Sequence, residues 1–231
     1  MYQVKWDQPI VRPVRRVGVT RRSVSGTYAF RGTLPVQFES TLERDFVMRA
    51  EFFTAVAQVV AQPVTIDFRG ADGRPLTYTP DYLVYYHLDG RHLEDYPRPL
   101  LVEVKPEAEW RAHWREWSTK WKAARTRARE EGWTFRIFDE SRIRDQVLSN
   151  IRFIERYQRM DFCEEESLAI IETVRQMGSV PFHYLLARHF VGDDTRIGIA
   201  HLWHLLAARR LDCDPERAFD HGTELWVSDH G

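Results

Sequence analysis

The alternation of apolar and polar residues along the chain predicts a mixed α/β protein. An apolar stripe at spacings of four and three residues predicts a first helix over residues 38–60, ended by Gln62-Pro63. Stretches dense in β-branched and aromatic residues predict strands at 64–68, 76–88, 100–105 and 134–139. Helical periodicity also predicts helices at 107–131, ended by Gly132, and at 141–159. This order of elements is typical of a mixed sheet flanked by helices.

After residue 160 the pattern changes to short elements, at about 164–177, 180–190, 195–210, 211–214 and 224–228. Three helices followed by a hairpin indicate a small helical, winged-helix-like domain. Residues 161–231 hold six Lys/Arg against thirteen Asp/Glu, a net charge of −7. Such a charge opposes unaided DNA binding, so docking to another protein is favoured. His201 and His204 lie three residues apart, but without an accompanying carboxylate or thiol a structural role is favoured.

The first 31 residues carry the opposite charge, with seven Lys/Arg, one acid and a net charge of +6. The clustered arginines are Arg12, Arg15, Arg16, Arg21 and Arg22. Because no hydrophobic period is present, an extended basic arm is expected. Such an arm suits nucleic-acid binding, although a solubilising tail would have the same composition. The expected organisation is a basic arm (1–31), an α/β domain (32–160) and an acidic C-terminal domain (161–231).

Overall composition indicates the class of protein and its expected cellular location. The chain has 231 residues, of which 43% are hydrophobic and 29% charged, as in ordinary globular proteins. No apolar run approaches the roughly 20 residues needed to cross a membrane. The N-terminus is too rich in arginine for a secretory signal. Cys163 and Cys213 form neither a metal-binding pair nor a disulfide framework, so a cytoplasmic protein is expected.

The candidate chemistry lies in two short stretches. Pro80-Asp81 places an acid beside a proline within the predicted strand at 76–88, and Glu103-Val104-Lys105 ends the next strand. Residues two apart in a strand point to the same face, so Glu103 and Lys105 should project together. If the strands are neighbours, Asp81 joins them. Two carboxylates beside an ammonium suit one or two Mg²⁺ ions, or Mn²⁺ as a substitute, with a phosphate next to the lysine.

A helical acid, Glu43, supports two interpretations. With Ser40 it fits a capping box, in which the glutamate reaches back to the start of its own helix. It could instead face the sheet and serve as a third metal ligand, directly or through water. The two downstream acids favour the ligand, because two carboxylates rarely complete such a site. Glu39, one turn earlier, is the alternative helical acid.

Tryptophans mark the helix at 107–131, with Trp110, Trp114, Trp117 and Trp121 at spacings of four, three and four. Such a stripe favours a core or subunit interface over base stacking. Cationic residues cover the other faces of this helix. Among them, Lys120 and Lys122 are the candidates to contact DNA near the site, although a solvated helix face would have the same composition.

At these residues the chain resembles the PD-(D/E)xK restriction-endonuclease-like nucleases, through Pro80-Asp81 and Glu103-Val104-Lys105. More narrowly, it is similar to the TnsA-like endonuclease subunits of heteromeric transposases. That likeness rests on Phe38–Phe46, Gln62-Pro63, Tyr78–Leu83, Leu101–Pro106 and Gly132–Phe135. The resemblance implies a restriction-endonuclease-like sheet and an active-site set of Glu43, Asp81, Glu103 and Lys105.

The resemblance also implies a cut-and-paste system. The nuclease cuts double-stranded DNA at the 5′ ends of the transposon, and a TnsB-like DDE recombinase cuts and joins the 3′ ends. A TnsC-like AAA+ ATPase docks on the C-terminal domain of the nuclease. The expected location is the bacterial cytoplasm, at the nucleoid when active. Two alternatives stay open: a stand-alone restriction or repair nuclease of the same fold, and a catalytically silent adaptor that bridges DNA and an ATPase.

Overall fold

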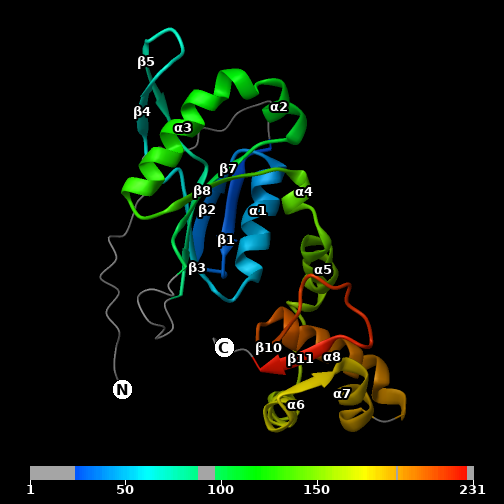
Figure 1. Ribbon diagram of the computed structural model, residues 1–231. Coiled ribbons are helices and arrows are strands. Elements are labelled where there is room, and N and C mark those ends of the chain that lie inside the picture. The colour runs from blue at the N-terminus through cyan, green and yellow to red at the C-terminus, as the bar shows by residue number, and fades with distance from the viewer. Residues whose placement is uncertain (1–23, 88–96, 191, 228–231) are drawn as a thin grey trace, which may run out of the picture. The chain divides into compact units, whose positions relative to one another are not determined.

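The computed structural model describes residues 24–87, 97–190 and 192–227 (Figure 1). The arginines predicted to form a basic arm lie outside these residues. The chain divides into two compact units, Met1–Glu51 with Val56–Arg142, and Phe52–Ala55 with Ile143–Gly231. No helix among the described residues is long and apolar enough to cross a membrane.

A four-stranded mixed sheet forms the centre of the first unit. Its order is β3 (Val56–Ala61), β6 (Tyr82–Tyr86), β7 (Leu100–Val104) and β8 (Thr134–Phe138). The β3–β6 and β6–β7 pairs are antiparallel, whereas β7 and β8 are parallel. A parallel pair needs a long crossover, supplied here by the helices between β7 and β8. The result is the mixed α/β fold that the sequence pattern predicts, with the restriction-endonuclease-like sheet that the resemblance implies.

Helices cover both faces of this sheet (Figure 1). On one face, Phe46 of α1 (Thr41–Phe52) packs against Tyr82 and Phe138, with ring centroids 5.4 and 5.2 Å apart. The other face is covered by α3 (Trp114–Glu130), which follows α2 (Glu107–Ala112). Trp121, Ala124 and Ala128 of α3 are buried against Leu83 and Leu101. The sheet thus has an α1 face and an α3 face, each covered by the helix of that name.

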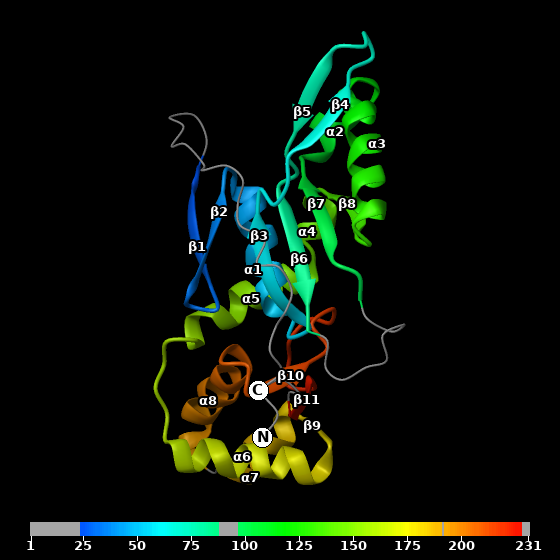
Figure 2. The ribbon, with the colours of Figure 1, turned by 90° about the vertical axis from the view of Figure 1, so that its left-hand side faces the viewer.

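Two hairpins stand outside the four-stranded sheet: β1 (Gly26–Phe30) with β2 (Leu34–Phe38), and β4 (Ile66–Arg69) with β5 (Pro75–Tyr78). Figure 2 shows the β4–β5 hairpin extending beside α3, which β4 contacts.

Several predicted boundaries are wrong. The helix predicted at 38–60 ends at Phe52, because the β-branched Val56, Val59 and Val60 extend the chain as β3 and pair with β6. The strand predicted at 76–88 is interrupted at residues 79–81. The helices predicted at 107–131 and 141–159 each divide in two, the latter into α4 (Glu140–Ile143) and α5 (Gln146–Ile154).

The second unit has a winged-helix order. It runs α6 (Glu164–Met177), β9 (Ser179–Pro181), α7 (Phe182–His189), α8 (Thr195–Ala207), β10 (Leu211–Cys213) and β11 (Glu224–Val227). The strands form a sheet of order β10-β11-β9, so the predicted hairpin gains a third strand. His201 is buried, with its Nε2 2.8 Å from Ser167 Oγ, which fits the favoured structural role.

The second compact unit includes α5, which packs against its later helices and loops. The side-chain amide of Asn150 donates to the carbonyl of Pro215 at 2.9 Å and to that of Arg217 at 2.6 Å. Phe153 packs edge-on against Trp203 of α8, with centroids 5.3 Å apart. These contacts join α5 to helices and loops that lie much later in the chain.

Candidate active site

Asp81 enters the site through a break between two strands. Tyr78 ends β5 and Tyr82 begins β6, so the predicted position of Asp81 inside a strand is wrong. Pro80 lacks a backbone N–H and cannot donate to a ladder, which fits an interruption here. The Asp81 carboxylate accepts a hydrogen bond from the Val104 N–H at 2.7 Å. This bond fixes the acid against the end of β7.

Strand register explains why Asp81 meets Glu103. Leu83 of β6 pairs with Leu101 of β7, and both lie in the apolar cluster under α3. Asp81 directly precedes β6, and its carbonyl still accepts a hydrogen bond from the Gln62 N–H, so it continues the alternation of β6 and lies on the same side as Leu83. Glu103 lies two residues after Leu101 and faces that side as well. Lys105 Nζ lies 3.9 Å from Asp81 Oδ2 and 3.8 Å from Glu103 Oε1. The structure therefore brings Asp81, Glu103 and Lys105 together.

Glu103 is only 1% exposed and has partners on both oxygens. The Tyr78 hydroxyl donates to Oε2 at 2.5 Å, and Lys120 Nζ lies 3.3 Å from Oε1. Tyr78 is a site residue that the sequence does not predict, although it lies just before the Pro80-Asp81 motif. Lys120 is predicted from sequence as a DNA contact near the site, but its carboxylate partner Glu103 is not.

The tryptophan stripe helps to place Lys120. The Lys120 ammonium lies 4.6 Å from the ring centroid of Trp117, 5.0 Å from Tyr78 and 5.8 Å from Trp121. Aromatic faces attract a cation at such distances. Trp121 is 1% exposed and belongs to the core, whereas Trp114 is 44% exposed. Lys122, the other predicted DNA contact on this helix, is exposed.

Glu43 makes the capping interactions of its own helix. Its carboxylate accepts from the Glu39 N–H at 2.8 Å and from the Ser40 hydroxyl at 3.0 Å, and Ser40 Oγ accepts from the Glu43 N–H. The Tyr82 hydroxyl also points to it, at 3.4 Å. Tyr82 pairs with Val102, so it faces the opposite side of the sheet from Leu101 and Glu103. Glu43 thus approaches from the α1 face, and Asp81 and Glu103 from the α3 face.

The reserve acid Glu39 is partly buried, and its carboxylate accepts from the side-chain amide of Gln62 at 3.3 Å.

Electrostatic coupling still links all four predicted site residues. Burial raises the pKa of Asp81 well above its usual range, Glu103 and Glu43 raise it further, and Lys105 opposes them. Burial also raises the pKa of Glu43, against its capping hydrogen bonds. Burial acts to lower the pKa of Lys105, but the charges of Asp81, Glu103 and Glu43 outweigh it and raise that pKa. Lys105 is therefore a cation at neutral pH rather than a proton acceptor.

The raised pKa of Asp81 predicts a pH-dependent stability. Above the unfolded value, about 3.9, the folded protein binds more protons at this position than the unfolded chain does. The stabilising contribution of Asp81 to the unfolding free energy is therefore complete below a pH of about 3.9. It is lost as the pH rises through the pKa that Asp81 has in the folded protein. In metal-free buffer, Asp81→Asn should therefore lose less unfolding free energy than wild type as the pH rises. Urea unfolding across pH tests this, and the exposed Asp67→Asn should follow the wild type.

Removing the Tyr78 hydroxyl should destabilise the first unit. Tyr78→Phe leaves one oxygen of a buried carboxylate without its donor, which costs about 1–3 kcal/mol. Tyr86→Phe is the matched control, because no described residue hydrogen-bonds its hydroxyl. Equal unfolding free energies for the two variants in urea would show that the Tyr78–Glu103 bond contributes little.

A divalent cation fits the pair of acids on the α3 face better than it fits all three acids. Within residues 24–87, 97–190 and 192–227, no three His, Cys, Asp or Glu side chains are grouped closely enough to hold a metal ion. Asp81 Oδ1 receives no hydrogen bond from the described residues, and the crowding of Asp81 with Glu103 is a repulsion that a cation relieves. Carboxylate oxygens are the ligands that Mg²⁺ prefers.

The fold and these residues define a restriction-endonuclease-like protein with an acidic site beside two lysines. Residues 54–140 match the family model described as TnsA-like endonuclease N terminal, and residues 142–214 match TnsA endonuclease C terminal. No curated protein matches the chain. The chain belongs to the TnsA-like endonuclease family. It is accordingly a DNA endonuclease of the Tn7 TnsA type, in a transposase complex that acts on DNA.

Proposed function

We propose that this protein hydrolyses a DNA phosphodiester bond with Mg²⁺, at the 5′ ends of a cut-and-paste transposon. The observation that supports this best is the meeting of Asp81, Glu103 and Lys105 at the ends of β5, β6 and β7. Packing three ionisable side chains against one another removes them from water, which lowers the free energy of unfolding. Their juxtaposition therefore favours a functional role over a structural one.

In this proposal Asp81 and Glu103 hold one or two Mg²⁺ ions, for which Mn²⁺ substitutes. The bound ion polarises the scissile phosphate and lowers the pKa of the attacking water. Lys105, kept protonated by the acids, orients that water or stabilises negative charge on the phosphate. Tyr78 and Lys120 hold the Glu103 carboxylate in place. Glu43 contributes through water or through its charge, since its own oxygens serve the helix cap.

The proposed partners divide the work. A TnsB-like DDE recombinase processes the 3′ ends, and a TnsC-like AAA+ ATPase docks on the acidic C-terminal region, residues 161–231. The DNA strand contacts Lys120, Lys122 and the basic N-terminal arm. The proposed setting is the bacterial cytoplasm, at the nucleoid.

The transposase proposal and a stand-alone restriction or repair nuclease differ in a cutting assay. The purified protein with Mg²⁺ should cut a plasmid carrying the transposon ends poorly until the recombinase is added. Efficient cutting of plain DNA by the protein alone would instead support the stand-alone nuclease.

Metal binding distinguishes the proposed nuclease from a catalytically silent adaptor. Calorimetric titration with Mn²⁺ should give a saturable isotherm for wild type and Asp67→Asn, and a much weaker one for Glu103→Ala. Wild-type protein that binds no Mn²⁺, with or without DNA, would favour the adaptor.

A further inference from the structure

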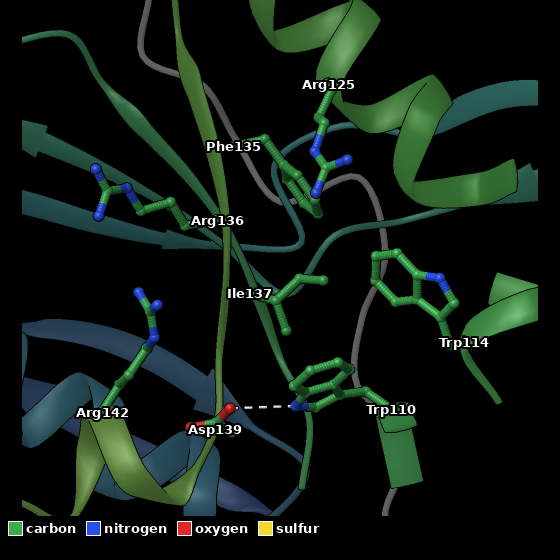
Figure 3. A pocket seen from close by; sticks show the side chains of 8 residues that line it. All are labelled: Trp110, Trp114, Arg125, Phe135, Arg136, Ile137, Asp139 and Arg142. Atoms are coloured by element: carbon green, nitrogen blue, oxygen red, sulfur yellow. Dashed lines mark hydrogen bonds between the residues drawn. The ribbon is translucent and has the colours of Figure 1, made fainter. Parts of the chain in front are cut away.

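A shallow hollow lies along the outer edge of β8 in the first unit (Figure 3). Phe135 and Ile137 line it, and their partners across β7 are Leu101 and Glu103, so both lie on the α3 face. Arg136 also lines the hollow but lies on the opposite face of the strand. Side chains from both faces can border one hollow where it follows the open edge of the strand.

That edge is unpaired within the described part of the chain. β8 is the last strand of the sheet and pairs there with β7 alone. Such an edge presents a row of backbone N–H and C=O groups that can accept a further strand. The hollow therefore borders a strand edge whose backbone groups are able to pair with a further strand.

The side chains around this edge have a defined chemistry. Figure 3 shows Arg136 and Arg142 on one side of β8 and the indoles of Trp110 and Trp114 on the other, with Arg125 above. None of the three arginines forms an ion pair with any described residue. The carboxylate among the lining residues, Asp139, is occupied by hydrogen bonds from Trp110 Nε1 at 3.1 Å and the Ser141 hydroxyl at 2.6 Å. The surface is thus apolar along its floor and cationic at its rim.

We propose that the outer edge of β8 is a docking site for an extended, acidic peptide segment of another protein, which adds to the sheet as a further strand. Main-chain hydrogen bonds to β8 would supply affinity. Apolar residues at alternate positions would lie against Phe135, Ile137 and Trp114. Acidic residues between or beside them would pair with the three arginines, whose guanidinium groups bind carboxylates in a bidentate manner.

Other occupants fit this edge less well. A second copy of the chain would bring two sets of arginines together, which like-charge repulsion opposes. Single-stranded DNA would match the arginines and aromatic rings but offers no amide backbone to pair with β8. Protection against aggregation explains an arginine on a short edge strand, but not an exposed Trp114 beside Phe135 and Ile137.

The test uses full-length protein and a fluorescein-labelled synthetic peptide in which glutamate alternates with valine and phenylalanine. Fluorescence anisotropy at low salt should show saturable binding. The double variant Arg136→Glu/Arg142→Glu should weaken it by about tenfold or more, because two rim charges are reversed. Arg129→Glu, an exposed position on α3 outside the hollow, is the matched control and should bind as wild type does. Hydrogen exchange should slow at β8 amides when the peptide is bound.

Backbone pairing is tested with two further peptides, N-methylated at odd or at even positions. In one of these two peptides, the methyl groups replace the amide hydrogens that would face β8. That peptide should therefore lose binding. A lysine-for-glutamate peptide that binds equally well would overturn the proposal, as would full binding by both methylated peptides. A thymidine oligonucleotide that depends on Arg136 and Arg142, with no binding of the acidic peptide, would overturn it in favour of a nucleic-acid groove.

Discussion

Asp81→Asn should reduce DNA cleavage by at least about 10³-fold, equivalent to about 4 kcal/mol of transition-state stabilisation. The substitution removes one of the two carboxylates that face the same space on the α3 side, and with it the charge that would hold Mg²⁺. An asparagine keeps an oxygen that can accept the Val104 N–H, so the junction of β6 and β7 is retained. Nicking of a plasmid carrying the transposon ends, with recombinase and Mg²⁺ present, measures the loss.

The control for this prediction is Asp67→Asn, which changes an exposed aspartate of the β4–β5 hairpin. It should cut at the wild-type rate. Circular dichroism should show that Asp81→Asn remains folded at neutral pH. If Asp81→Asn cuts as fast as Asp67→Asn, Asp81 is not a metal ligand and the proposed mechanism is wrong.

Trp121→Ala should destabilise the first unit by about 3–5 kcal/mol, because it empties a large volume in the core. Trp121 packs with Leu83 and Leu101, the residues whose register aligns Asp81 with Glu103. It also forms one wall of the aromatic surroundings of Lys120. Urea unfolding followed by hydrogen exchange of the β6 and β7 amides would report the loss in this unit separately from the second one.

Trp114→Ala provides a control on the same helix, at the residue that begins α3. Its side chain is 44% exposed, and its ring lies 5.4 Å from that of Trp121, so its removal should cost about 0.5–1.5 kcal/mol, less than the removal of Trp121. Similar losses for the two variants would mean that Trp114 is buried in solution, for example in a subunit interface.

The site shows how far sequence reasoning can reach. Glu103 and Lys105 lie two residues apart in a strand that the sequence predicts, so the two-residue period alone indicates that they point in the same direction. Asp81 is connected to them by pairing between separate strands, and sequence could only state that as a condition. Glu43 is harder still, since the same residue fits a helix cap and a metal ligand. The structure shows the cap, because the Glu43 carboxylate accepts hydrogen bonds from the Glu39 N–H and the Ser40 hydroxyl at the start of α1.

The predicted boundary of a helix is wrong where the local sequence fits a helix and a strand equally well. The stripe of apolar residues after Thr41 continues past Phe52 into Val56, Val59 and Val60, and spacing alone cannot distinguish a buried strand from a longer helix there. Pairing with β6 decides in favour of the strand. Likewise, the inclusion of α5 in the second compact unit depends on contacts of Asn150 and Phe153 with residues far along the chain, which composition does not reveal.

By itself, the sequence determined the mixed α/β class, the tryptophan-rich helix, the separate acidic region and the residues able to carry nuclease chemistry, since these follow from short-range periodicity and residue type. Only the tertiary structure decided which of those residues share one face of the sheet, that Tyr78 and Lys120 hold Glu103, and that the edge of β8 is open. These features depend on strand register and helix placement, which arise from contacts between residues distant in the chain.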